Sequence, residues 1–227
     1  MKKLLILLLV VLSACHSKPK TPFTILRSVK AANGITTIDV QVNNRVSKQE
    51  MVAIAAYIKS DSSQYKNLQI NYLLPGNSYK NTGGITIYAT AAYHNIMAAA
   101  DTVKDTDNNL LSFEFVGFTP EKAKQLLAFK PDSMPGKRIM GKFIDDNTKT
   151  ISIIYEDKRD DDQIHILELD TLGKVVSAIV PMEVTYKGVQ KLVVSQKGDY
   201  LVLKDSVLTM YSSDDFEKPY RSIKEGL

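Results

Sequence analysis

The chain has 227 residues, of which 44% are hydrophobic and 24% charged, and 29 Lys and Arg against 25 Asp and Glu leave a formal net charge of +4. This composition is typical of a globular protein, and so small an excess of positive charge does not favour a nucleic-acid partner. A single cysteine cannot form an intramolecular disulfide, the Cys and His content does not favour a tetrahedral zinc site, and we expect neither a metal nor another cofactor.

The first fifteen residues have the anatomy of a secretory signal. Met1-Lys2-Lys3 is positively charged, residues 4–12 form an unbroken apolar run, and small residues precede Cys15. The run is about half as long as a membrane-spanning helix, so we predict that it is removed. The tetrapeptide Leu12-Ser13-Ala14-Cys15 resembles the bacterial lipobox, which implies cleavage before Cys15 and a diacylglycerol on its thiol. A plain secretory signal with a chance cysteine is the alternative.

Residues 1–14 are thus predicted to be a signal peptide, and Cys15 is predicted to tether the protein to a membrane. Residues 15–34 are expected to form a linker. Because no acidic residue lies between Cys15 and Ile38, the linker is either solvated, as we expect, or held against anionic headgroups. His16 stands where an Asp would resemble an inner-membrane retention signal. We therefore expect a protein of the bacterial cell envelope, anchored in the outer membrane and facing the periplasm.

The pattern of residues 35–130 predicts an α+β domain. Residues 36–42 alternate as a half-buried strand does, and Ser47 with Glu50 forms a capping box that starts a helix with one apolar stripe. Thr119 followed by Pro120 predicts the start of a second, short helix. Because strand, helix and strand follow each other, a crossover connection is expected, and it is right-handed if the two strands are adjacent and parallel. We predict a mixed four-stranded sheet with both helices on one face, its remaining strands at residues 68–74, 85–93 and 111–115.

Residues 130–136 contain two prolines and a glycine, and they mark the predicted domain boundary. Residues 137–215 then alternate in segments about ten residues apart, with turn signals between them. This pattern predicts an antiparallel meander of about seven strands that curls into a barrel-like sheet. Residues 216–227 are expected to be a tail. The predicted strands cover residues 137–145, 150–157, 163–170, 175–186, 189–196, 200–204 and 207–211.

The order of these elements resembles a family of uncharacterised bacterial lipoproteins and secreted proteins. The resemblance rests on a strand that ends in Leu73-Leu74-Pro75-Gly76, a strand that ends in Tyr93-His94, and a β-rich second half. It covers most of residues 35–215. It implies a two-part fold and no established activity, and it assigns no catalytic residue.

The common catalytic and metal-binding signatures are absent from the sequence. His94 ends a predicted strand and is the candidate general base if the protein is an envelope hydrolase that acts with nearby carboxylates. His165 lies between two isoleucines on a predicted strand, so its side chain is expected to point away from theirs. Three acidic clusters could supply oxygen ligands for calcium, but Lys158 and Arg159 divide the second cluster, for which a solvated turn is the expected structure. The clusters are Asp145-Asp146, Glu156-Asp157 with Asp160-Asp161-Asp162, and Asp214-Asp215.

Six of the eleven tyrosines fall in residues 57–93, around a polar loop that runs from Pro75 to Gly84. Tyrosine is favoured at interfaces, although strand propensity also explains most of this cluster. We expect Tyr72 and Tyr93 to face the core and Tyr79 to be exposed. The predicted function is a non-enzymatic binding or scaffolding module with an envelope protein or glycan as partner, and a hydrolase or a hydrolase inhibitor is the alternative. The candidate binding surface comprises Pro75, Gly76, Tyr79, Tyr93 and His94, and a face of the C-terminal sheet is the alternative contact surface.

Overall fold

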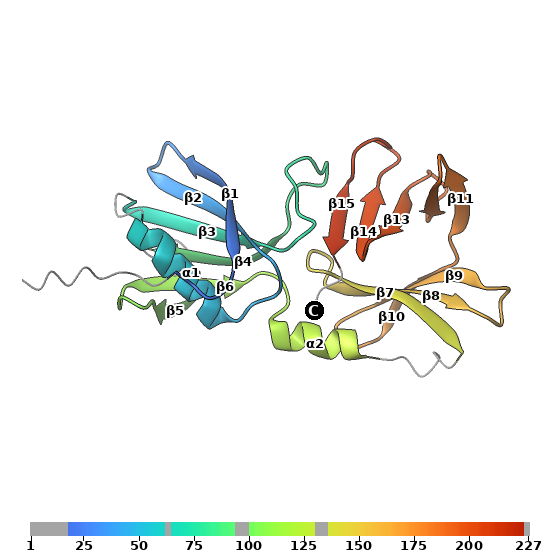
Figure 1. Ribbon diagram of the computed structural model, residues 1–227, viewed down its shortest axis with the longest axis horizontal. Coiled ribbons are helices and arrows are strands. Elements are labelled where there is room, and N and C mark those ends of the chain that lie inside the picture. Colours follow the sequence, from blue (N-terminus) through green and yellow to red (C-terminus); the bar gives the residue numbers. More distant parts are fainter. Residues whose placement is uncertain (1–17, 62–64, 94–99, 130–135, 225–227) are drawn as a thin grey trace, which may run out of the picture.

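The computed structural model describes residues 18–61, 65–93, 100–129 and 136–224 (Figure 1). Within these residues the chain forms three sheets and two helices. The expectation of an α+β fold with two helices on one mixed sheet is wrong, because the described part of the chain is mainly β, with 49% of its residues in strands and 12% in helices. No helix in the described ranges has both the length and the hydropathy of a membrane span.

The first sheet has six strands rather than the four predicted. Its order is β1-β2-β3-β4-β6-β5, and helix α1 (Lys48–Asp61) packs on it (Figure 1). The adjacent parallel strands β2 and β3 flank α1 in the chain, so the predicted crossover connection between two strands is present. The strands are β1 (Phe23–Lys30), β2 (Ile35–Val42), β3 (Asn67–Leu73), β4 (Ile87–Tyr93), β5 (Asp101–Lys104) and β6 (Leu110–Phe115).

Helix α1 begins as the capping box predicts. Ser47 Oγ accepts from the Glu50 backbone N–H at 3.3 Å, and Glu50 Oε2 accepts from the Ser47 backbone N–H at 2.9 Å. Hydrogen bonds from Thr21 and Ser47 lower the pKa of Glu50. The stripe that includes Met51 and Ile58 is buried against the sheet.

The segment expected to be a linker contains strand β1. It pairs antiparallel with β2, and the Phe23 ring lies 6.0 Å from the Tyr57 ring of α1. This strand could not be predicted from the sequence pattern. Seven of its eight residues are exposed, so it lacks the alternation of a half-buried strand.

The second half forms two further sheets instead of one barrel-like meander. The middle sheet has the order β10-β9-β8-β7 and the last sheet the order β11-β12-β13-β14-β15. The middle-sheet strands are β7 (Lys137–Asp145), β8 (Thr150–Asp157), β9 (Gln163–Leu169) and β10 (Val175–Ile179). Those of the last sheet are β11 (Met182–Tyr186), β12 (Val189–Val193), β13 (Tyr200–Lys204), β14 (Val207–Tyr211) and β15 (Arg221–Lys224).

The predicted strand 175–186 is interrupted at Val180-Pro181, where the chain leaves the middle sheet and enters the last one. Proline lacks the N–H that a continuous strand needs, which accounts for the break. The predicted tail holds β15, which completes the last sheet beside β14. The middle and last sheets share a core that includes Phe143, Ile154, Leu192 and Leu208.

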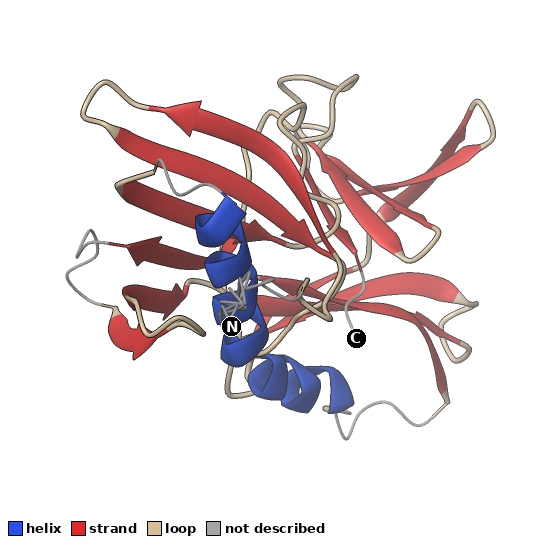
Figure 2. Ribbon diagram, turned by 60° about the vertical axis from the view of Figure 1, so that its left-hand side comes forward, coloured by secondary structure: helices blue, strands red, loops and turns tan. Residues whose placement is uncertain are grey.

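Helix α2 (Pro120–Ala128) packs on the middle sheet rather than beside α1, and Figure 2 shows the two helices against different sheets. Thr119 caps it by accepting from the Lys122 backbone N–H, as predicted. Ala123 and Leu126 pack against Ile151 and Ile153 of β8. The apolar face of α2 therefore joins the core of the second half, although the helix precedes the predicted domain boundary.

Candidate functional site

The loop between β3 and β4, which was predicted as a binding surface, is hydrogen-bonded to the C-terminal segment of the chain. The backbone N–H groups of Thr82 and Gly83 donate to the carbonyls of Pro219 and Tyr220, both at 2.9 Å. Gly76 has φ of +96°, and a Cβ built on it would lie 2.7 Å from the Ser222 carbonyl oxygen. Figure 1 shows the loop reaching from the first sheet to β15. These contacts give the loop a structural role between the two halves.

Tyr79, in the middle of this loop, is 45% exposed, as expected, but its hydroxyl is engaged. It donates to Asp39 Oδ2, and the Arg27 guanidinium carbon lies 4.5 Å from the ring centroid. Burial of the hydroxyl and its hydrogen bond to Asp39 raise the pKa of Tyr79 to about 12. Asp39 itself is fully buried and also accepts from Asn71 Nδ2 at 2.7 Å. One side of the ring thus remains available to a partner.

The other residues of the predicted surface are not brought together with Tyr79 in the described part of the chain. Tyr93 is buried in the first core and its hydroxyl donates to Asp105 Oδ2 at 2.8 Å, so it is not a surface residue. The expectation that Tyr72 and Tyr93 face the core is confirmed. Pro75 is half-buried at the junction of the sheets. His94 lies outside the described residues, as do Leu12, Ser13, Ala14 and Cys15.

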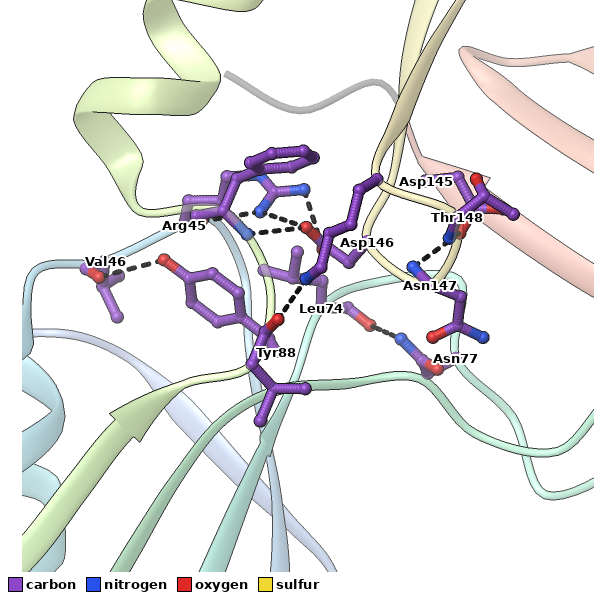
Figure 3. A network of polar contacts seen from close by, with 12 residues as sticks. Arg45, Val46, Leu74, Asn77, Tyr88, Asp145, Asp146, Asn147 and Thr148 are labelled. Atoms are coloured by element: carbon purple, nitrogen blue, oxygen red, sulfur yellow. Dashed lines mark hydrogen bonds and ion pairs between the residues drawn. The ribbon is translucent and has the colours of Figure 1, made fainter. Parts of the chain in front are cut away.

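A buried ion pair joins the first sheet to the middle sheet. Arg45 precedes α1, and its two terminal nitrogens donate to the two carboxylate oxygens of Asp146 at 3.0 and 2.8 Å (Figure 3). Their side chains are 6% and 5% exposed. The Phe118 backbone completes the arrangement, because its carbonyl accepts from Arg45 and its N–H donates to Asp146. Each charge is therefore compensated, as a buried ion pair requires.

The neighbouring carboxylate of Asp145 is held by Arg221 of β15, so the same turn also meets the last sheet. The acidic pair Asp145-Asp146 is buried rather than solvated, because two arginines from distant segments cover it. The enclosed space at this junction is about 60 Å³, which accommodates water rather than a larger ligand. We refer to Arg45, Asp145, Asp146 and Arg221, with the loop at 74–86, as the junction.

A larger concave site lies between the middle and last sheets, with a volume of about 450 Å³, within the size range of small-molecule sites. Ile166 and Ile179 form one apolar wall, and Leu201 and Met210 form part of the other. We call this site the inter-sheet cleft. It is lined by Ser152, Ile166, Glu168, Ile179, Val194, Asp199, Tyr200, Leu201, Leu208, Met210, Tyr211, Ser212 and Tyr220.

Polar groups sit among these apolar walls. Ser152 and Glu168 are cross-strand partners on β8 and β9. Asp199 accepts from the Ser213 backbone N–H at 2.8 Å and from Ser195 Oγ at 2.7 Å, and these hydrogen bonds lower its pKa. Asp199 therefore carries its charge at neutral pH, and the cleft disfavours anionic ligands.

The Tyr200 ring stacks on the Tyr211 ring at a centroid distance of 4.6 Å and an interplanar angle of 6°. Its hydroxyl donates to the Phe216 carbonyl at 2.9 Å. Both tyrosines line the cleft. The stacking and this hydrogen bond fix the aromatic edge of the site in place, so the cleft is formed before a ligand arrives.

The described residues hold no set of three or more His, Cys, Asp and Glu side chains placed to bind a metal. His165 faces away from Ile164 and Ile166, as predicted, and its ring stacks on the Tyr155 ring at 5.1 Å. Its Nε2 lies 3.1 Å from Asp160 Oδ2 without hydrogen-bond geometry. The hydrolase hypothesis rests on His94, which lies outside the described residues.

Sequence reasoning missed the junction charges and the whole inter-sheet cleft. Arg45 and Asp146 are separated by 101 residues, and no local spacing connects them. The cleft arises where the chain changes sheet at Val180-Pro181, and the proline was the one available signal. No protein-family model, curated protein or solved structure matches the chain.

Proposed function

We propose that the protein is a lipid-anchored, non-enzymatic binding module of the bacterial cell envelope, and that its ligand occupies the inter-sheet cleft. The lipobox-like residues Leu12 to Cys15 support the anchor, and the outer membrane facing the periplasm is the proposed location. The observation that carries the binding proposal is the cleft of about 450 Å³ between the sheets. A non-enzymatic role is proposed because the cleft combines apolar walls with carboxylates and hydroxyls but includes no histidine, lysine or arginine.

The walls of the cleft define the class of ligand. Ile166, Ile179 and Met210 offer apolar contact, which favours an aliphatic or aromatic group. Glu168 and Asp199 add negative charge, so a neutral or cationic amphiphile is preferred over an anion. An apolar side chain of an envelope protein and a small apolar metabolite share this chemistry.

Met210→Trp tests the site directly because a bulkier side chain at this half-buried position fills the cleft. Val202→Trp is the matched control, since Val202 lies on the same sheet but does not line the cleft. The probe is the neutral fluorophore N-phenyl-1-naphthylamine, titrated into each variant. The chain has no tryptophan of its own, so each variant also carries a single tryptophan, whose fluorescence can be excited apart from that of the tyrosines.

We expect the wild-type chain to bind one probe with saturation, Met210→Trp to bind at least about tenfold more weakly, and Val202→Trp to bind within about twofold of wild type. Urea unfolding of each variant confirms that it is folded. Equal binding by all three proteins, or no saturable binding by the wild-type chain, would overturn the proposal.

The anchor is tested separately. Cys15→Ser removes the thiol that the lipid would occupy, so the protein should move from the membrane fraction to the soluble fraction. Incorporation of a labelled fatty acid should disappear in the same variant. A protein that stays in the membrane fraction after Cys15→Ser is not anchored through this residue.

A further inference from the structure

Exposed apolar residues gather on β10, β11 and the turns beside them. Of eighteen exposed large hydrophobic residues in the described ranges, eight fall between residues 172 and 189. Every residue of β11 is exposed. Concentrated apolar exposure of this kind marks interaction surfaces. The eight residues are Leu172, Val175, Val176, Val180, Met182, Val184, Tyr186 and Val189.

Strand β11 is a free edge of the last sheet, and it lacks the protective features that the edge strands β1 and β10 have. Edge strands are normally protected by bulges, Lys or Pro. β1, at the edge of the first sheet, has a bulge between Ile25 and Arg27, and β10 has one between Val175 and Ser177. β11 pairs with β12 without a bulge and contains neither Lys nor Pro. Its edge is therefore open to another strand.

The hairpin turn determines which backbone groups face outward. Lys187 and Gly188 have φ of +49° and +76°, which is typical of a two-residue type I′ turn. Such a turn is closed by a hydrogen-bonded pair, here Tyr186 and Val189, and hydrogen-bonded pairs then alternate along the strands. Glu183 and Thr185 consequently direct their backbone N–H and C=O groups to the free edge.

We propose that this edge binds a second copy of the chain, with β11 antiparallel to β11 of the partner around a two-fold axis at Val184. In this register Glu183 of each copy lies opposite Thr185 of the other copy, which gives two hydrogen-bonded pairs. Met182 then lies opposite Tyr186 of the other copy on the exposed apolar face, a thioether and an aromatic ring that attract each other.

The neighbouring registers are poorer. An axis at Glu183 places two carboxylates opposite each other and brings Thr185 to Pro181, which has no N–H to donate. An axis at Thr185 brings Glu183 to Lys187, which lies in the turn, so one hydrogen-bonded pair remains. Charge and hydrogen bonding therefore select the axis at Val184.

The position of the edge leaves room for a second copy. β11 lies at the right-hand end of the molecule in Figure 1, and the first sheet lies at the opposite end. In the pair, the five-stranded last sheets of the two copies would form one continuous sheet of ten strands. The first sheet of each copy would lie at an opposite end of it.

The test is a disulfide in the full-length chain. At the two-fold axis the two Val184 residues form a non-hydrogen-bonded pair with Cα atoms about 4.5 Å apart, which suits a disulfide. Val184→Cys should therefore give a covalent dimer on mild oxidation. Val189→Cys is the control, because it lies on the same apolar face but far from its counterpart. Three strand spacings across the sheet and four residues along the strands, each about 14 Å, place the two residues about 20 Å apart. The wild-type chain, whose single cysteine is Cys15, reports any crosslink through that residue.

A second substitution separates pairing from random collision. Thr185→Pro removes an N–H that only the second copy would use, whereas Thr185→Val keeps it. We expect Val184→Cys to crosslink at least about tenfold more than Val189→Cys, to lose the crosslink with Thr185→Pro, and to retain it with Thr185→Val. Equal crosslinking of Val184→Cys and Val189→Cys, persistence with Thr185→Pro, or a crosslink to a different protein would overturn the proposal.

Discussion

The junction and the β11–β12 hairpin reverse the usual placement of residue types. At the junction, Arg45 and Asp146 are almost fully buried, whereas on the hairpin Met182 and Tyr186 are 63% and 55% exposed. The buried charges are tolerated because each has a charged partner and backbone hydrogen bonds. The exposed Tyr186 ring meets the ammonium groups of Lys187 and Lys191, each 5.2 Å from its centroid, and stays more than half exposed. The difference separates residues that stabilise the fold from residues that are available for contact.

Arg45→Ala should give the largest effect. It leaves Asp146 buried without its partner, and we expect the free energy of unfolding to fall by about 3–5 kcal/mol. Urea unfolding followed by circular dichroism measures the loss. The double variant Arg45→Leu with Asp146→Leu removes both charges and should recover most of it. A loss below about 1 kcal/mol for Arg45→Ala would show that the ion pair does not stabilise the junction.

Gly76→Ala tests the contact between the loop and β15. Its Cβ would lie 2.7 Å from the Ser222 carbonyl oxygen, so the loop or β15 must move, and we expect a loss of about 1–3 kcal/mol beyond the cost of the left-handed backbone. Gly84→Ala is the matched control, since Gly84 has φ of +76° and open space around its Cβ position. Equal losses from the two substitutions would mean that the loop does not pack against β15.

Tyr79→Phe tests the same loop through the pH dependence of the free energy of unfolding. The raised pKa of Tyr79, about 12, means that its neutral form is favoured in the folded protein. Its contribution to stability is therefore full below the unfolded pKa of about 10 and is lost as the pH rises through about 12. We expect the free energy of unfolding to fall less between about pH 9 and about pH 11 in Tyr79→Phe than in the wild-type chain. Identical pH dependence would contradict the engagement of the Tyr79 hydroxyl.

Val184→Ser should give the smallest effect on the fold. The side chain is 38% exposed on an edge strand, so we expect the free energy of unfolding to change by less than about 0.5 kcal/mol. Unfolding at low protein concentration keeps any pairing between copies out of the measurement. A large loss of unfolding free energy would show that Val184 stabilises the fold, as the junction residues do, and would contradict the comparison between the two regions.

Local signals in the sequence predicted local structure well. The capping box of Ser47 and Glu50, the Thr119 cap and the strand alternation before and after α1 all correspond to observed elements. Each of these signals is complete within a few residues, and the physical interaction that produces it is local.

The errors came from interactions between distant segments. The placement of α2 on the middle sheet depends on its apolar face meeting Ile151 and Ile153, and the burial of Asp146 depends on Arg45, 101 residues away. The fold class was wrong for the same reason, because exposed strands such as β1 add to the β content without alternating. The inter-sheet cleft forms between two separate sheets. The alternating pattern of residues 137–215 is the same for one sheet and for two, so it did not predict the cleft.

Hydrogen exchange in the presence of N-phenyl-1-naphthylamine tests the central claim most directly, because it compares the inter-sheet cleft with the loop that the sequence favoured. Binding in the cleft should slow backbone exchange in β9, β13 and β14 and leave residues 75–84 unchanged. Slower exchange confined to residues 75–84, with no change in the cleft strands, would contradict the account.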